Sequence, residues 1–508
     1  MRTVLILGEI LRRHALLRPR KTAYVVGATR VTYAQFNADA NRLAHGLQAL
    51  GVGRGERVAI LANNCPQYPL AYFACIKLGA ILVPVNARFK DDEIDYVVRH
   101  SESMALLYEA GFGVAVERLR GRWPHVQHYR AVDDARFAAW LGEHSSAEPP
   151  AFVDENDPHV MLYTSGTTGA PKGALLSHRS YYLQAGHSHH TIGLSEDDVG
   201  LSMFPMFHMG GWALPFGFWY DGSTIIIMER ADPRAMLEAV QHEHVTYLYA
   251  VPTVYNFMLD LPDFDDFDLS SLRTLAGGTS VMTNEQIRRI TERFHNHNLF
   301  IIYGSTEAGP VATLRPADLF RKPASVGRPA LNVEVRIVGD DNCEVPVGTP
   351  GEIICRSEFN MRGYWRMPTE SAATLRGGWV HTGDLGVLDD EGFLFIAGRK
   401  KEMIKSGGEN IFPVEVERVL LEHPAIAEAA VLGIPDPDWG ESVLAVVVPR
   451  PGQQLSEADV VGHVRNRLAG YKKPRNVWFR DALPRTAATR QVQKTLLREQ
   501  FQARTVRK

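Results

Sequence analysis

Short apolar runs that alternate with helix-like segments constrain the fold of this chain more than any other feature. The run at 57–61 is followed by a helical pattern at 68–79 and by another apolar run at 80–85. Strands that are apolar on both faces are typical of sheets covered by helices on each side. Further apolar runs of this kind lie at 159–164, 223–228, 271–278 and 299–304. The pattern predicts a layered α/β fold, and several runs end in Gly, Ser and Thr at positions where α/β sheets collect ligands.

The length of 508 residues predicts two to four packing units. After Gly327, turns separate short β-like runs, which predicts a small, mostly β unit. A charged cluster at 398–405 then marks a boundary, after which helix-like and strand-like segments alternate again. We therefore expect a large N-terminal domain over 1–398 and a small α+β domain over 402–508, with Lys401 at or near the joint.

The charge balance of the whole chain does not favour polyanionic partners. Lys and Arg number 55 and Asp and Glu 58, for a net charge of −3, so no general attraction to nucleic acid or anionic lipid is expected. The segment 471–508 is basic, which fits either a phosphate-bearing ligand or a solvated tail helix. The N-terminus reads as an amphipathic helix, and the apolar stretch 204–220 is shorter than the ~20 residues of a membrane span. We expect no integral membrane segment, and the absence of a C-x-x-C pair favours a reducing, cytoplasmic location.

The most informative segment is YTSGTTGAPKG, residues 163–173. Glycines allow the backbone to approach a phosphate chain, the hydroxyl residues add donors, and Lys172 adds a mobile positive charge. Pro171 stands where the P-loop of common NTPases has glycine, so the segment is not that loop. A flexible surface loop is the alternative for a segment of this composition.

This segment resembles the signature loop of the adenylate-forming superfamily, which includes acyl-CoA synthetases, peptide-synthetase adenylation domains and firefly luciferase. Four more family motifs follow in order: FPMFHMGG at 204–211, YGSTE at 303–307, HTGD at 381–384 and GRKKEMIKSGGENIFPVEVE at 398–417. The nearest likeness is to bacterial fatty-acyl-CoA synthetases. The resemblance implies a ligase that joins a carboxylic acid to AMP, releases pyrophosphate, and then transfers the acyl group to coenzyme A.

The resemblance also assigns the ATP site. Lys172 and Glu307 would be catalytic, and Glu307 with Thr164 would hold Mg²⁺, which prefers oxygen ligands. Tyr303 would stack on adenine and Asp384 would accept hydrogen bonds from the ribose; the alternatives are a core aromatic and a turn residue, and for Glu307 a solvated surface group. The residues expected to bind ATP are Thr164, Ser165, Gly166, Thr167, Thr168, Gly169, Lys172, Gly277, Gly278, Thr279, Tyr303, Gly304, Ser305, Thr306, Asp384 and Arg399.

The resemblance places His208 beside the acyl pocket, with a catalytic role at the developing acyl-phosphate. A hydrophobic, fatty acid is the expected substrate, although core packing would select the same apolar residues. The residues expected to line this pocket are His208, Met209, Gly210, Gly211, Trp212, Tyr249 and Val251.

Lys401 occupies the family's hinge position. The resemblance therefore implies a hinge over 399–401, about which a mobile C-terminal domain over 402–508 would rotate between the two half-reactions. Coenzyme A would then meet glycines that leave room for pantetheine and basic residues that meet its phosphates. The residues expected to contact it are Ser406, Gly407, Gly408, Glu409, Tyr471, Lys472 and Lys473.

One segment departs from the family. The family's C-terminal catalytic lysine follows a glycine, but here the matching segment reads PRTAATRQVQK from Pro484. Alignment on 492–494 puts Gln491 at the lysine position, whereas alignment on Pro484 puts Arg490 there. A neutral amide does not replace an ammonium charge among anions. We therefore expect slow adenylation, unless Arg490 or Lys494 is recruited in place of the lysine.

Two other functions fit the same motifs. The chain could load a separate carrier protein in place of coenzyme A, or bind nucleotide and acyl ligands without catalysis, and a homodimer is compatible with either. The small-molecule partners would be a carboxylic acid, ATP and coenzyme A. A zinc site is weakly suggested by His187, His189, His190, His242 and His244, but neither an H-E-x-x-H motif nor a cysteine partner accompanies them.

Overall fold

The computed structural model describes residues 5–150, 152–164, 170–279, 282–406, 409–485 and 492–506. It divides into two compact units. Unit 1 comprises Met1–Arg321, Pro329–Glu334 and Cys355–Val380; unit 2 comprises Lys322–Arg328, Val335–Ile354 and His381–Lys508. The predicted α/β class, with a large N-terminal and a small C-terminal part, is confirmed. The domain limits at 398 and 402 and the hinge at Lys401 stay predictions.

One sheet of unit 1 carries mostly parallel strands. Its described strands follow the order β18 (Gly363–Tyr364), β8 (Lys172–Ser177), β7 (Pro158–Thr164), β4 (Ile81–Val85), β3 (Arg57–Leu61), β5 (Ala105–Tyr108) and β6 (His128–Ala131). Strand β3 pairs in parallel with β4 and β5, while β7 and β8 form an antiparallel hairpin. The runs at 57–61, 80–85 and 159–164, which were predicted to be buried strands, are β3, β4 and β7, so these predictions are confirmed.

The other strands of unit 1 follow the order β14 (Gly309–Leu314), β13 (Leu299–Ser305), β12 (Thr274–Gly278), β11 (Tyr247–Tyr249), β9 (Val199–Ser202), β10 (Thr224–Ile227), β1 (Thr22–Val26) and β2 (Thr29–Thr32). From β13 to β1 neighbouring strands are parallel, so their carboxyl ends meet at one edge. The runs at 223–228, 271–278 and 299–304 are β10, β12 and β13, as predicted.

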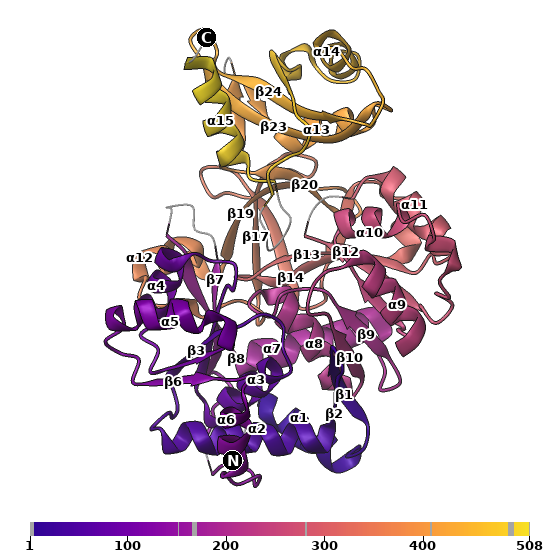
Figure 1. Cartoon of the computed structure of the whole chain (residues 1–508). Helices are drawn as coiled ribbons and strands as arrows, with labels where there is room; N and C mark the ends of the chain where they lie inside the picture. The colour runs from indigo at the N-terminus through magenta and orange to yellow at the C-terminus, as the bar shows by residue number, and fades with distance from the viewer. Residues whose placement is uncertain are drawn as a thin grey trace. The chain divides into compact units, whose positions relative to one another are not determined.

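Helices lie between these two sheets and on their outer faces (Figure 1). The inner helices are α1 (Leu7–Leu17), α2 (Tyr33–Ala49), α3 (Gln67–Leu78), α7 (His178–Ser188) and α8 (Met209–Asp221). The outer or peripheral helices are α4 (Asp91–His100), α5 (Gly113–Leu119), α6 (Ala135–Gly142), α9 (Pro233–Glu243), α10 (Pro252–Leu259), α11 (Asn284–Arg293) and α12 (Pro368–Thr374). One buried cluster joins the inner helices to Leu82 of the first sheet and Ile225 of the second, so the main core lies between the sheets.

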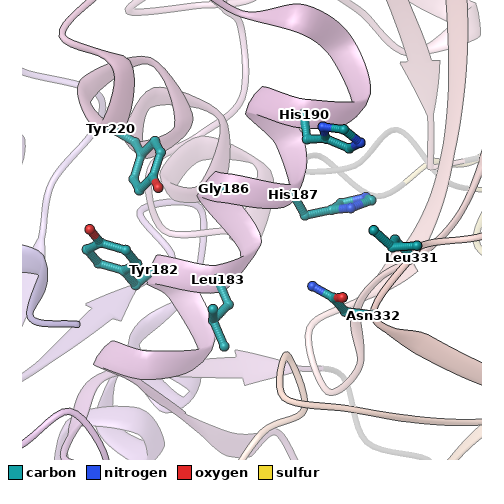
Figure 2. Close-up of a pocket in the computed structure, with 8 residues that line it drawn as sticks. All are labelled: Tyr182, Leu183, Gly186, His187, His190, Tyr220, Leu331 and Asn332. Carbon is teal, nitrogen blue, oxygen red and sulfur yellow. The ribbon is translucent and has the colours of Figure 1, made fainter. Parts of the chain in front are cut away.

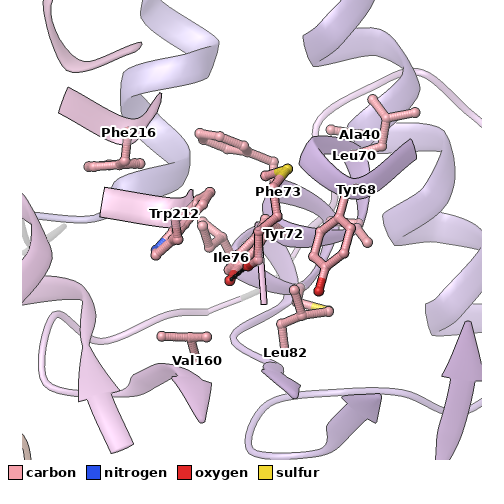
Figure 3. Close-up of a cluster of buried hydrophobic side chains, with 14 of the residues drawn as sticks. Ala40, Tyr68, Leu70, Tyr72, Phe73, Ile76, Leu82, Val160, Trp212 and Phe216 are labelled. Atoms are coloured by element: carbon pink, nitrogen blue, oxygen red, sulfur yellow. Dashed lines mark hydrogen bonds between the residues drawn. The ribbon is translucent and has the colours of Figure 1, made fainter. Parts of the chain in front are cut away.

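The centre of this core is aromatic (Figure 3). The rings of Tyr72 and Trp212 stack with centroids 3.7 Å apart and planes 3° apart. Phe73 and Phe216 pack beside them, and the Tyr72 hydroxyl donates to the Met206 carbonyl at 3.2 Å. The apolar stretch 204–220 therefore contributes buried core through α8. None of the described helices is long and apolar enough to cross a lipid bilayer.

Unit 2 is built from two groups of strands. The first, which lies mainly in unit 2, has the order β16 (Val333–Val338), β17 (Gly351–Ser357), β19 (Val380–Leu388), β20 (Leu394–Arg399) and β15 (Ser325–Pro329). The second has the order β22 (Glu409–Ile411), β21 (Ile404–Ser406), β24 (Gly440–Pro449) and β23 (Ile426–Asp436), with β25 (Asn476–Phe479) also on β24. Helices α13 (Pro413–Leu421), α14 (Glu457–Arg465) and α15 (Lys494–Val506) cover the second group.

Candidate active site

The two ends of the phosphate loop lie opposite each other in unit 1. Thr164 ends β7, Lys172 begins β8, and the two residues are register partners across the hairpin. The Tyr96 hydroxyl donates to the Pro171 carbonyl at 3.0 Å and so ties the C-terminal end of the loop to α4. The predicted ATP ligands between these ends, Ser165, Gly166, Thr167, Thr168 and Gly169, lie outside the described residues.

Glu307 lies beside this hairpin. It follows β13, whose end belongs to the sheet edge at which α/β enzymes collect ligands. The Thr164 hydroxyl donates to Oε1 of Glu307 at 3.0 Å, and the Tyr364 hydroxyl donates to the same oxygen at 2.9 Å. The Lys172 ammonium lies 5.2 Å from the centre of the Tyr364 ring. A half-buried carboxylate, two hydroxyls and an ammonium group thus gather from four separate segments of unit 1.

The donor set fits a hard divalent cation. Mg²⁺ prefers carboxylate and hydroxyl oxygens, and Thr164 and Glu307 already bring one of each within hydrogen-bond distance. Lys172 supplies a positive charge nearby that would meet phosphate oxygens rather than the metal. These two oxygen ligands would hold Mg²⁺ together with a polyphosphate, as the sequence predicts.

Two glycines of the predicted ATP site, Gly278 and Gly304, lie tightly against neighbouring protein atoms. A Cβ on Gly278 would lie 2.5 Å from both the Ile302 carbonyl oxygen and the Tyr249 hydroxyl. A Cβ on Gly304 would lie 2.3 Å from the carbonyl oxygen of Gly309. Only glycine fits at these strand ends, where β12 and β13 run side by side. The assignments of Gly277, Gly278, Thr279, Tyr303, Gly304, Ser305 and Thr306 to ATP stay predictions.

His208 precedes α8 and carries a nearly buried imidazole. Its Nε2 is buried and has no hydrogen-bond partner among the residues that the structure describes. Burial, and next the positive charge of Arg88, lowers the pKa of His208 to about 4. At neutral pH the ring is therefore uncharged and keeps one nitrogen available for a bound polar group.

The other residues predicted to line the acyl pocket fall into two groups. Met209, Gly210 and Tyr249 are half-buried, and the Tyr249 ring lies edge-on to Phe204 at 5.0 Å. In contrast, Gly211, Trp212 and Val251 are buried, and Trp212 belongs to the aromatic core described above. Burial of this kind is what core packing alone would produce, so the pocket assignment of these three residues remains a prediction without support from their contacts.

Unit 2 contains the predicted ribose ligand. Asp384 in β19 is register partner of Arg399 in β20, and Arg399 Nε donates to Asp384 Oδ1 at 2.6 Å. Asp384 is buried whereas Arg399 is exposed. The pair is built by neighbouring strands of one sheet, and its binding to ribose stays a prediction.

The residues predicted to bind coenzyme A are also in unit 2. Ser406 and Glu409 are register partners of the β21–β22 hairpin, and Gly407 and Gly408 between them lie outside the described residues. Lys472 donates to Glu415 at 2.7 Å. Tyr471 is exposed and Lys473 half-buried. Part of the positive charge predicted for coenzyme A is thus already used by a carboxylate, and the coenzyme A site remains a prediction.

Known proteins are similar to this chain in sequence and in fold. Residues 11–365 match the AMP-binding enzyme family, and residues 415–490 match the AMP-binding enzyme C-terminal domain. The chain belongs to the AMP-binding enzyme family. It is 39% identical over 495 residues to an indoleacetate–CoA ligase of Aromatoleum aromaticum, covering 95% of each chain. It is 35% identical over 511 residues to the long-chain-fatty-acid–CoA ligase FadD13 of Mycobacterium tuberculosis, covering 98% of this chain and 99% of that ligase.

A solved structure gives the same result. The crystal structure of the anthranilate CoA ligase AuaEII, in complex with anthranoyl-AMP, superposes with a TM-score of 0.90 at 31% identity, covering 97% of this chain and 96% of that one. The adenylate-forming assignment from sequence is therefore confirmed. The enzyme is an AMP-forming acid–thiol ligase whose co-substrates are ATP and coenzyme A.

The C-terminal catalytic position of this ligase lies outside the described residues, which include neither Arg490 nor Gln491. Lys494, the first residue of α15, is described. Its ammonium donates to Glu402 and lies 2.8 Å from an oxygen of each of Glu402 and Glu417. In this arrangement both carboxylates engage Lys494, and its recruitment in place of the catalytic lysine stays a prediction.

A small cavity of the ligase lies in unit 1 at α7 (Figure 2). Its walls come from α7, the π-helical turn at His189–Gly193, the end of α8 and the segment around Asn332. The lining residues are Tyr182, Leu183, Gly186, His187, His190, Tyr220, Leu331 and Asn332. His187 and His190 point into it side by side, whereas the neighbouring His189 lies 2.6 Å from Asp221 through Nδ1. None of the predicted acyl-pocket residues lines this cavity.

The sequence analysis missed Tyr364. Its hydroxyl makes one of the two hydrogen bonds to Oε1 of Glu307, yet it belongs to none of the motifs used above. The signal available was the string RGYWRMP at 362–368, in which two aromatic residues follow a glycine. Gly363 has φ +137°, a conformation that other residues rarely adopt, and so marks a special backbone position.

Proposed function

We propose that this ligase activates a hydrophobic, fatty carboxylic acid in the cytoplasm. The observation that carries the ATP-dependent step is the gathering of Thr164, Glu307 and Lys172 at the strand ends of unit 1. Half-buried apolar and aromatic residues near His208 support an apolar acyl group. The relatives named for indoleacetate and for long-chain fatty acids both act on acids that are apolar beyond the carboxylate. A homodimer stays a prediction.

In the first half-reaction the substrate carboxylate attacks the α-phosphorus of ATP and pyrophosphate leaves. Bound Mg²⁺ would neutralise charge on the polyphosphate, held by Glu307 and Thr164. Lys172 would pair with phosphate oxygens, and the neutral His208 would meet the carboxylate with its unused nitrogen. The residues thus mainly position two anions and reduce their repulsion.

In the second half-reaction the thiolate of coenzyme A attacks the acyl carbonyl and AMP leaves. Ser406, Glu409 and Tyr471 would line the approach of coenzyme A in unit 2. Lys401 would act as the hinge that changes which residues of unit 2 face the adenylate.

Gln491 bears directly on the rate of the first half-reaction. An amide carries no charge, so adenylation should be slow while ATP and acyl-adenylate binding persist. We expect Gln491→Lys to accelerate pyrophosphate release about tenfold or more. The test measures pyrophosphate release and thioester formation in both proteins with a medium-chain fatty acid and with an arylacetic acid.

Faster turnover with the fatty acid in both proteins would support the proposed substrate class. Preference for the arylacetic acid would replace it with an aromatic acid. If Gln491→Lys brings no gain in rate, the proposed effect of Gln491 is wrong.

A further inference from the structure

Tyr364 contacts both the phosphate-loop hairpin and Glu307. Strand β18 pairs with β8, and Tyr364 is the register partner of Ala174, two residues after Lys172. From this position its ring reaches Lys172 and its hydroxyl reaches Glu307. The residue therefore contacts both charged groups of the candidate ATP site.

Backbone hydrogen bonds fix the segment that carries Tyr364. The Met361 amide donates to the Glu307 carbonyl at 2.8 Å, and the Arg362 and Trp365 amides donate to the carbonyls of Leu175 and Gly173, each at 2.8 Å. The Tyr364 amide donates to the Ser371 hydroxyl of α12 at 2.8 Å. Hydrogen bonds to Glu307, to β8 and to α12 thus fix the backbone that carries the phenol, and they keep its hydroxyl within reach of Glu307.

The two hydroxyl donors act on the same oxygen. Thr164 and Tyr364 both donate to Oε1 of Glu307, at 3.0 and 2.9 Å, which leaves Oε2 clear of both donors. A phenol hydroxyl is an uncharged donor, as is the threonine hydroxyl beside it.

We propose that Tyr364 is a positioning residue for the magnesium site, which rests on the proposed function of that site. Its hydroxyl orients the Glu307 carboxylate toward the cation, and its ring holds the Lys172 ammonium beside the phosphates. Neutral donors can orient a carboxylate without cancelling its charge, which a lysine or arginine partner would do. The two roles are separable because one needs the hydroxyl and the other needs the ring.

Tyr364→Phe tests the hydroxyl. ATP binding is measured by calorimetry at increasing Mg²⁺ concentration, and the expected result is a Mg²⁺ requirement about tenfold higher than that of the wild type. Tyr129→Phe is the matched control, because the half-buried Tyr129 donates to the Arg120 carbonyl in another part of unit 1. This control should leave the Mg²⁺ requirement unchanged.

Two further measurements separate positioning from a merely structural effect. Thioester formation from supplied acyl-adenylate and coenzyme A involves no ATP, so Tyr364→Phe should leave its rate unchanged. In a Glu307→Gln background, Tyr364→Phe should have no further effect on the Mg²⁺ requirement. Tyr364→Leu, which also removes the ring, should additionally weaken ATP binding by about tenfold.

The proposal is overturned if Tyr364→Phe leaves the Mg²⁺ requirement unchanged or lowers it, or if thioester formation from acyl-adenylate falls in parallel with ATP binding. These outcomes differ from failure of the proposed function. If the wild-type ligase itself takes up no ATP in the presence of Mg²⁺, then the ATP site is wrong. If the wild type binds ATP and the variant binds it equally well, only the assignment of Tyr364 fails.

Discussion

Glu307 of unit 1 and the pair Glu402 and Glu417 of unit 2 are held in opposite ways. In unit 1, Glu307 accepts hydrogen bonds from the uncharged hydroxyls of Thr164 and Tyr364. In unit 2, Glu402 and Glu417 share the ammonium of Lys494. Neutral donors orient a carboxylate and leave its charge available, whereas an ammonium cancels that charge. The proposed magnesium site predicts that Glu307 keeps its charge for a cation, and we expect the Lys494 cluster to stabilise its unit instead.

The largest effect on activity should come from removing the negative charge of Glu307 in unit 1. Glu307→Gln retains the shape of the side chain but loses its negative charge. We expect adenylation to fall about a hundredfold or more, because the Mg²⁺ site loses its carboxylate. The free energy of unfolding should change little, which urea unfolding can check. If Glu307→Gln releases pyrophosphate as fast as the wild type at limiting Mg²⁺, the contrast between Glu307 and the carboxylates of unit 2 has no functional basis.

In unit 2, the loss of the Lys494 charge should lower the free energy of unfolding. Lys494→Met leaves Glu402 and Glu417 without their shared cation, and Lys494 is only 16% exposed. Breaking such a pair from one side should cost about 2 kcal/mol of the unfolding free energy, less than for fully buried ions because Glu402 is partly solvated.

Lys494→Arg is the matched control, since it preserves the charge and should recover most of the stability. Hydrogen exchange in α13 and α15 would localise the effect to this cluster. Equal stability of the Met variant and the wild type would show that the three charges are independent.

A smaller effect concerns the uncharged imidazole of His208 in unit 1. Its folded-state pKa of about 4 lies below the ordinary value of 6.5, so the unfolded chain takes up the proton first as the pH falls. The stability gained by keeping the ring neutral is full above pH 6.5 and is lost progressively toward pH 4. Between pH 7.5 and 5.5 the expected loss is about 1 kcal/mol.

His208→Leu should remove that part of the pH dependence, as measured by urea unfolding at the two pH values. His178 and His187, whose pKa values burial also lowers to about 4, remain in both proteins and provide a common background. If the two proteins lose equal stability on acidification, His208 is not kept neutral by burial.

The fold was largely predictable because periodicity and apolar runs are local signals. Strands β3, β4, β7, β10, β12 and β13 all coincide with runs identified in the sequence. Strand β18 is only two residues long, so no periodicity marks it, and Tyr364 reaches Lys172 only through strand register. Contacts made by register between distant segments leave no local pattern in one sequence.

The acyl pocket shows a different limit of prediction from sequence. The residues that follow His208 are apolar, and both a substrate pocket and a packed core select apolar residues. Trp212 stacks on Tyr72, more than a hundred residues earlier, and this pairing depends on how α3 and α8 pack. The sequence could therefore predict burial at this position but not which surface the ring would contact.

The central claim is that the ends of the phosphate loop and Glu307 form a site for ATP with Mg²⁺. Calorimetric titration of the wild-type ligase with ATP, with Mg²⁺ and with excess EDTA, tests this claim most directly. The account predicts uptake of one equivalent of ATP with Mg²⁺, and much weaker uptake when EDTA removes the metal or when Glu307 is replaced by Gln. Absence of binding with Mg²⁺, or binding that is indifferent to both changes, would contradict it.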